Sequence, residues 1–253
     1  MNNEVSITAL MSSFGRAFHA ENEDHPVLAD HLAKELMTAE EYAAVLGYIR
    51  GGARFFEPEI NPVKQAKKEL LRRLVNVHIA PSPLCRAAYT EQVLKTAVLT
   101  GTKQYVMLGA GLDTFAFREK EFLSKHRVFE VDHPLTQKDK IERITRAGWT
   151  IPDNLTFVSA DFTKDNVAER LIDGGFDASE KRVQNTIMMA KAGGEPMQSA
   201  FSYSEIEKLL EKHGFLIYEL LTPDDIQRDI IDKAGADMKA FEHVNYCLAV
   251  RKN

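Results

Sequence analysis

Cysteine is scarce in this sequence: Cys85 and Cys247 are the only two among 253 residues, and each has apolar neighbours. A disulfide framework of the kind that stabilises small secreted proteins is therefore excluded. The histidines indicate no metal site, because His19, His25 and His31 recur every six residues and so fall on different faces of a helix. We expect a protein of the reducing cytoplasm without a bound metal.

Long apolar runs and an excess of basic residues are also missing. No stretch approaches the ~18 consecutive apolar residues that span a bilayer. The first residues, MNNEVSITALMSSFGR, lack the basic start and apolar core of a secretory signal peptide. The formal net charge is −5, which argues against an electrostatic grip on nucleic acid or on an anionic membrane. The expected partner is a small molecule.

Helical signals dominate the first hundred residues. Thr38 and Glu41 have the spacing of a capping box, followed by apolar residues at helical spacing. Pro62 predicts the start of another helix, and a proline-containing break separates it from a third helix over about Leu84 to Leu99. Residues 1–102 are therefore interpreted as a helical cap.

From residue 103 onward, short apolar runs alternate with helical segments. The predicted strands are Gln104–Leu108, Val128–Asp132, Leu155–Ser159, Phe215–Leu221 and Val244–Val250. The predicted helices are Pro134–Arg146, about Asn166–Ile172 and a segment that begins at the Ser202–Glu205 capping box. This alternation is typical of a doubly wound, Rossmann-like α/β sheet, which we assign to residues 103–253.

Glycines and an acid lie where the first two strands end. Gly109 and Gly111, on either side of Ala110, leave room for a ligand to approach the backbone. Asp132 ends the second strand, 132 − 109 = 23 residues later, where a carboxylate can accept hydrogen bonds from both hydroxyls of a ribose. Because ligands bind outside the carboxyl ends of parallel strands, these residues predict a nucleoside-containing ligand.

The third strand ends in Asp161 and Phe162, where the acid could meet an adenine amino group and the ring could lie beside the base. His133 follows Asp132 and could border the site, although a helix-capping role is the simpler interpretation. The charged helix that carries Lys138, Lys140, Arg143 and Arg146 is interpreted as a solvated face.

The glycine turn distinguishes between two cofactors. A nicotinamide dinucleotide site needs a third glycine beneath the pyrophosphate, and Thr114 occupies that position. Asp113, which precedes it, would repel a pyrophosphate but suits the cationic methionine end of S-adenosylmethionine (SAM). The sequence therefore favours SAM.

Several segments together resemble the leucine carboxyl methyltransferase family, in its branch of bacterial small-molecule O-methyltransferases. The resemblance runs through SSFGRAFHAENEDHPVLADHLAKELMTAEEY, APSPLCRAAYTEQVL, VMLGAGLDTFAFR, VFEVDHPLTQKDKIER, FVSADFTK and GEPMQSAFSYSEIEKLLEKHGF, and so covers most of both halves. It implies a seven-stranded SAM methyltransferase fold and methyl transfer to a carboxylate or hydroxyl of a small molecule.

The resemblance also implies roles for individual residues. In such enzymes an arginine before the first strand binds the SAM carboxylate, and Arg86 occupies the matching position. The glycine turn at 109–111 then meets the methionine end, Asp132 the ribose, and the Asp161–Phe162 pair the adenine. Arg16, in the lid-like N-terminal segment, is a weaker candidate for the entrance of the site. The resemblance assigns no catalytic residue.

The chain departs from the family after Asp177. The letters GGFD at 174–177 predict the beginning of a fourth strand, but a few residues later the chain reads VQNTIMMAKAGGEPM. A strand, helix and strand unit needs ~30 or more residues, and there is no such room. We therefore predict an internal deletion of two strands and their connecting helix, around residues 177–183.

Such a deletion would expose the edge of the first strand. Three arrangements would cover that edge: Val183 to Ala190 recruited as a strand, a partly disordered region, or a partner subunit in a homodimer. Either the natural protein has a segment that this chain lacks, or the chain is a reduced form. Its function is then that of a methyltransferase or, alternatively, of a catalytically impaired SAM-binding or structural remnant of the fold.

Overall fold

The N-terminal part of the protein is helical, as the sequence predicts. The computed structural model describes residues 7–56, 58, 67–99, 101–178, 203–242 and 244–251. The first helices are α1 (Ile7–Asn22), α2 (Leu32–Glu35), α3 (Ala39–Gly51), α4 (Ala53–Phe56), α5 (Lys67–His78) and α6 (Pro81–Leu99). The predicted capping box opens α3, where the Thr38 side chain accepts from the Glu41 N–H and the Glu41 carboxylate accepts from the Thr38 N–H.

Helix α6 starts earlier than its prolines suggest. Pro81 and Pro83 lie in its first turn instead of before it. Proline is tolerated there because the first N–H groups of a helix have no partner within the helix. The predicted helix start at Pro62 lies outside the described residues, as do Ser202 and the segment Val183–Ala190.

Among the residues that the structure describes, three parallel strands form the central sheet, in the order β1-β2-β3. They are β1 (Gln104–Leu108), β2 (Arg127–Asp132) and β3 (Leu155–Ser159), connected through α7 (Phe115–Arg118), α8 (Lys120–Leu123) and α9 (Pro134–Arg146) and followed by α10 (Val167–Asp173). The register pairs Leu108 with Val131 and Asp132 with Ser159. The carboxyl ends of all three strands therefore meet at one edge, as the α/β prediction requires.

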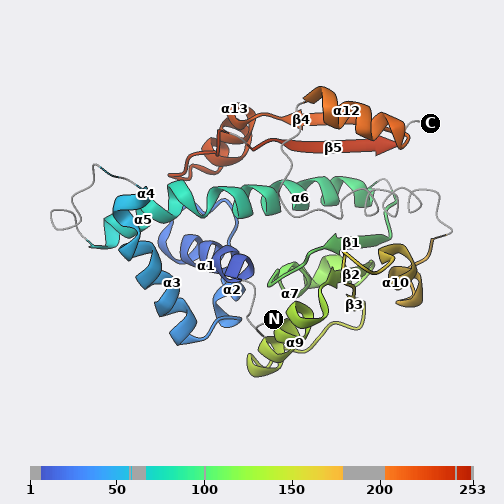
Figure 1. The fold of residues 1–253 in the computed structure, drawn as a ribbon, viewed down its shortest axis with the longest axis horizontal. Coiled ribbons are helices and arrows are strands. Elements are labelled where there is room, and N and C mark those ends of the chain that lie inside the picture. Colours follow the sequence, from blue (N-terminus) through green and yellow to red (C-terminus); the bar gives the residue numbers. More distant parts are fainter. Residues whose placement is uncertain are drawn as a thin grey trace.

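Both faces of this sheet are covered by helices. On one face Val128 packs with Ile144 of α9, and on the other Val131 packs with Leu171 of α10. Figure 1 shows α9 and α10 on opposite sides of the strands. This is a Rossmann-like α/β layer arrangement with few strands.

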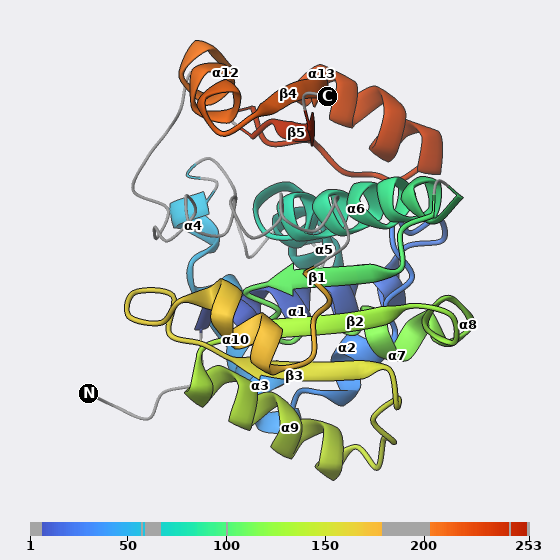
Figure 2. The ribbon, with the colours of Figure 1, turned by 90° about the vertical axis from the view of Figure 1, so that its right-hand side faces the viewer.

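The C-terminal part forms a second, separate sheet. It contains α12 (Tyr203–Lys212), β4 (Phe215–Leu221), α13 (Pro223–Ile226), the π-helical turn η1 (Gln227–Asp232) and β5 (Tyr246–Arg251). Strands β4 and β5 pair antiparallel with each other. Helix α6 lies between the two sheets (Figures 1 and 2), and its Tyr89 donates a hydrogen bond to Glu219 of β4 at 2.6 Å.

Strand β1 is one of the two edge strands of the central sheet among the described residues. The prediction of a strand beginning at 174–177 is wrong, because these residues form a turn and irregular backbone. The chain nevertheless returns to β1 there. The Gln104 amide donates to the Asp177 carbonyl at 3.0 Å and accepts from the Asp177 N–H at 2.9 Å. Asp177 thus lies beside β1, at the edge of the sheet where a further strand would pair.

The interpretation of α9 as a solvated face is wrong for two of its four cations. Lys140 and Arg143 are 1% and 3% exposed, whereas Lys138 lies in solvent. Helical spacing turns Lys140 toward the buried Glu130 of β2. Arg143 turns toward the cap, where it binds Glu41 at 2.6 Å. The two cations fasten α9 to the sheet and to the cap.

No described helix is both long enough and apolar enough to cross a membrane. The described residues likewise contain no group of three or more histidine, cysteine or acidic side chains that could hold a metal ion.

His19 of α1 is a buried histidine held in its neutral form. Its Nε2 accepts a hydrogen bond from the Val27 N–H at 3.1 Å, and its Nδ1 lies 3.5 Å from Oδ1 of Asn76. An accepting Nε2 cannot carry a proton, so the ring is the tautomer with hydrogen on Nδ1. Burial lowers the pKa of His19 from its ordinary value of 6.5, against smaller opposing effects of Asn76 and Glu23.

We expect this histidine to make folding sensitive to acid. Below pH 6.5 His19 binds a proton in the unfolded chain but not in the folded protein. The free energy of unfolding therefore falls by up to about 1.4 kcal/mol for each unit by which the pH is lowered. Thermal unfolding between about pH 7.5 and about pH 5.5 measures this loss. His19→Gln should flatten the dependence, and the exposed His31→Gln should leave it unchanged. Equal slopes in wild type and His19→Gln would contradict the assignment.

Candidate functional site

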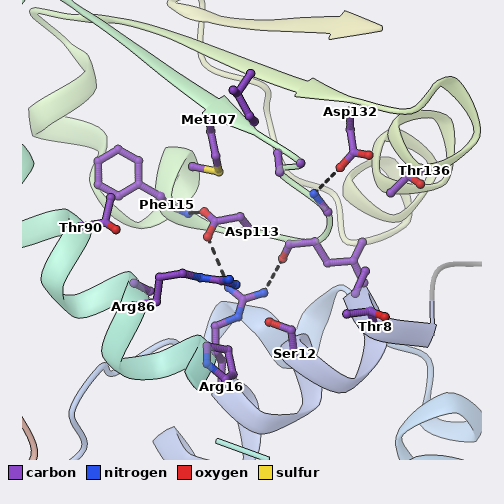
Figure 3. Close-up of a pocket in the computed structure, with 18 of the residues that line it drawn as sticks. Thr8, Ser12, Arg16, Arg86, Thr90, Met107, Asp113, Phe115, Asp132 and Thr136 are labelled. Atoms are coloured by element: carbon purple, nitrogen blue, oxygen red, sulfur yellow. Dashed lines mark hydrogen bonds and ion pairs between the residues drawn. The ribbon is translucent and has the colours of Figure 1, made fainter. Parts of the chain in front are cut away.

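A cavity of about 600 Å³ lies at the carboxyl ends of β1 and β2, against α1 and α6 (Figure 3). Its volume falls in the range of small-molecule sites, roughly 300–1,000 Å³. Its polar lining consists of Thr8, Ser12, Arg16, Arg86, Thr90, Glu91, Tyr105, Asp113, Asp132 and Thr136. The glycine turn Gly109–Ala110–Gly111 forms part of the same wall.

The glycine turn requires a backbone that other residues rarely adopt. Gly109 and Gly111 have φ angles of 69° and 51°. The N–H groups of Gly109 and Ala110 both donate to the Val131 carbonyl, at 2.8 and 3.3 Å, which binds the turn to β2. A Cβ on Gly109 would meet nothing within 4 Å. The backbone conformation, more than a lack of space, therefore explains the glycine at this position.

Asp132 is oriented by the backbone around it. Its Oδ2 accepts from the Gly111 N–H at 2.5 Å and its Oδ1 from the His133 N–H at 2.6 Å. Each carboxylate oxygen has a second lone pair, so Asp132 can still accept hydrogen bonds from a ligand in the cavity. His133 caps α9 by accepting from the Leu135 N–H at 3.3 Å, and it does not line the cavity.

Two opposite charges meet the cavity from different elements. Arg86 on α6 is exposed, and no hydrogen bond or ion pair engages its guanidinium among the described residues. Asp113, after the glycine turn, accepts from the Phe115 N–H through Oδ1 at 2.7 Å. Figure 3 shows both side chains directed toward the same part of the cavity. A cation and an anion placed in this way are complementary to an amino acid zwitterion.

Arg16 lies in the cavity wall and not at an exposed entrance. It is 4% exposed and pairs with Asp30 at 2.6 Å. Its other terminal nitrogen donates to the Leu112 carbonyl at 2.7 Å, so α1 is fastened to the glycine turn (Figure 3). Arg16 is thus a buried link between cap and sheet.

The structure does not bring Asp161 and Phe162 to the cavity lining. Asp161 accepts from Lys164 at 2.8 Å and from the hydroxyl of Thr163 at 2.6 Å, and these hydrogen bonds hold its pKa well below the ordinary range. Phe162 packs against the apolar cluster around Phe129. Their adenine-binding role stays a prediction.

Helix α6 contributes cavity residues that were not predicted from the sequence. Thr90 and Glu91 follow Arg86 and Ala87 by four residues each, so helical spacing was the signal that could have found them. Glu91 is nearly buried and pairs with Arg118 at 2.5 Å. Burial raises the pKa of Glu91, against the opposing effect of Arg118.

The chain is similar in sequence to proteins of a methyltransferase family. A family model described as leucine carboxyl methyltransferase matches residues 9–189. YktD of Bacillus subtilis (strain 168), provisionally named an S-adenosyl-L-methionine-dependent methyltransferase, is 35% identical over 301 residues, covering 99% of each chain. A protein of Parafrankia sp. (strain EAN1pec) with the same kind of name is 32% identical over 70% of this chain and 50% of its own length.

Among solved structures, magnesium protoporphyrin IX methyltransferase (ChlM) from Synechocystis PCC 6803, determined with bound SAH, aligns with a TM-score of 0.38 and 12% identity. The alignment covers 87% of this chain and all of that one.

The alignment with the Bacillus protein bears on the predicted deletion. It is 301 residues long, so at least 301 − 253 = 48 of its positions have no counterpart in this chain. Because 99% of both chains is covered, most of these positions are internal. The number exceeds what one strand, helix and strand unit needs, ~30 residues. The edge position of β1 agrees with a loss at this point.

Proposed function

The chain belongs to the leucine carboxyl methyltransferase family, and on this premise we propose that it binds SAM and transfers the SAM methyl group to an oxygen of a small molecule. The acceptor oxygen is a carboxylate or a hydroxyl. The observation that carries the proposal is that Arg86, with which no described residue pairs, faces the same cavity as Asp113, beside the glycine turn.

The residues of the cavity fit this cofactor. The guanidinium of Arg86 presents paired N–H donors that match a carboxylate, and Asp113 attracts an ammonium group. Asp132 has acceptor capacity left for two ribose hydroxyls after binding two backbone N–H groups. The amino acid and ribose parts of SAM thus have counterparts in the chain.

Methyl transfer would depend on binding and alignment by these residues. SAM, when bound, supplies a methyl group that its positive sulfur makes electrophilic. Arg86, Asp113 and Asp132 would hold the donor in one orientation, and orientation alone supplies a large part of the rate of such a displacement. A carboxylate acceptor loses no proton, so no general base is required for it.

The second candidate function is SAM binding without turnover. Two observations favour it. Strand β1 is an edge strand among the described residues, and the alignment with the Bacillus relative has at least 301 − 253 = 48 positions that this chain lacks. The described residues that line the cavity all precede Asp177, after which the gap is predicted. Binding and turnover can therefore be separated in this protein.

The proposal is tested first by calorimetry with SAM and with S-adenosylhomocysteine (SAH). We expect both to bind; no heat of binding at about millimolar ligand would overturn both candidates. Radiolabelled SAM with mixed carboxylic acids and alcohols then tests turnover. Methyl esters release volatile methanol in mild base whereas methyl ethers do not, which identifies the acceptor oxygen. Binding without any transfer would favour the second candidate.

A further inference from the structure

Asp30, in the segment between α1 and α2, is a fully buried carboxylate near the cavity. Its Oδ2 accepts from Nη1 of Arg16 at 2.6 Å. Its Oδ1 accepts from the Thr114 hydroxyl at 2.7 Å and from the Ala33 N–H at 3.2 Å, and lies 3.4 Å from Nε of Arg118. The buried carboxylate of Asp30 thus contacts Arg16, Arg118 and Thr114, the residue that follows Asp113.

Each of the two arginines reaches a different wall of the cavity. Arg16 donates to the carbonyl of Leu112, which directly follows the glycine turn, at 2.7 Å. Arg118 donates to Glu91 at 2.5 Å, on the helix that also carries Arg86. Asp30 itself is not part of the cavity lining. Any effect of Asp30 on a ligand must therefore pass through its partners.

Two acids compete for the same nitrogen of Arg16. Nη1 lies 2.6 Å from Oδ2 of Asp30 but 4.0 Å from Oδ2 of Asp113. The close contact goes to Asp30, which leaves the Asp113 carboxylate without a direct hydrogen bond from Arg16. If Asp30 lost its charge, Asp113 would be the nearest anion for that guanidinium, and pairing there would neutralise it.

We propose that Asp30 is a positioning residue for the amino acid end of SAM. It holds Arg16 away from Asp113 and so leaves Asp113 available to the ammonium group of the cofactor. This inference rests on the proposed function, because it requires SAM or SAH in the cavity.

The test compares two ligands that share adenosine and sulfur. SAH carries the amino acid end, and 5′-methylthioadenosine lacks it. In Asp30→Asn we expect the affinity for SAH to fall roughly 10- to 100-fold, the range for one charge-assisted contact. The affinity for 5′-methylthioadenosine should stay within about twofold. An equal loss for both ligands, as from a distorted cavity, or no loss for SAH would overturn the proposal.

A second variant tests the competition directly and contains no unpaired buried charge. In Arg16→Gln/Asp30→Asn the side chain at position 16 can no longer neutralise Asp113, so the affinity for SAH should return to within about threefold of wild type. If the double variant binds SAH as weakly as Asp30→Asn does, the proposal is overturned. If Asp30→Asn does not fold, an affinity of the double variant about tenfold below wild type overturns it equally. Asp24→Asn, exposed in the same segment, is the matched control. Wild type that binds no SAH would refute the proposed function instead.

Discussion

Replacing Arg86 by alanine is expected to weaken the binding of SAM and SAH roughly 10- to 150-fold, because hydrogen bonds to charged groups contribute about 1.5–3 kcal/mol. Arg86 is exposed, and no described residue forms a hydrogen bond or ion pair with its guanidinium. Its removal therefore leaves no group of the described residues without a partner. The free energy of unfolding should change by less than about 0.5 kcal/mol. Titration calorimetry measures the first effect, and urea unfolding the second.

Three comparisons make this result specific. Arg86→Lys keeps the charge but not the paired donors, so its affinity should lie between wild type and Arg86→Ala. Binding of 5′-methylthioadenosine, which has no carboxylate, should be unaffected by either variant. Arg50→Ala, on the exposed side of α3, is the matched control. Unchanged SAH affinity in Arg86→Ala would remove Arg86 from the site.

Lys140→Ala is expected to lower the free energy of unfolding by about 3–5 kcal/mol, because it leaves Glu130 as a buried charge without its partner. Glu130 is fully buried, and its Oε1 has no hydrogen-bond partner in the described part of the chain. Burial raises the pKa of Glu130 even with Lys140 beside it. Without the Lys140 ammonium, the Glu130 carboxyl should take up a proton when the chain folds. This proton uptake lowers the free energy of unfolding, and the loss becomes smaller as pH falls.

The controls separate the loss of this ion pair from a general loss of helix stability. Lys138→Ala, on the exposed side of α9, should change the free energy of unfolding by less than about 0.5 kcal/mol. Glu130→Leu/Lys140→Met removes both charges and should recover most of the stability. Urea unfolding at neutral and at acidic pH measures all four proteins. A loss in Lys140→Ala no larger than in Lys138→Ala would contradict the expectation.

The sequence predicted the parts of the fold that depend on neighbouring residues. The strands at Gln104–Leu108 and Leu155–Ser159, and the capping box of α3, are found where their local patterns place them. The positions of Gly109 and Asp132 beside one cavity also follow, because parallel strands bring their carboxyl ends together. The predicted gap after Asp177 followed from a length that was too short for a strand, helix and strand unit.

Other features of the site could not be predicted in this way. Nothing local distinguishes Lys140, which is buried, from Lys138, which is exposed, until the packing of α9 is known. Asp161 follows its strand as Asp132 does, yet it binds its own turn and lies away from the cavity lining. The family resemblance supplied Arg86 but not Asp30, which does not line the cavity and acts on it only through its partners.

The sequence by itself determined the order of helices and strands, the glycine turn and the family, because each of these depends on residues that are close together in the chain. The tertiary structure alone decided which charges pair. Arg16 and the Leu112 carbonyl are 96 residues apart in the chain, and Arg143 and Glu41 are 102 apart. Whether a buried charge is tolerated depends on the partner that folding brings to it, and chain order does not specify that partner.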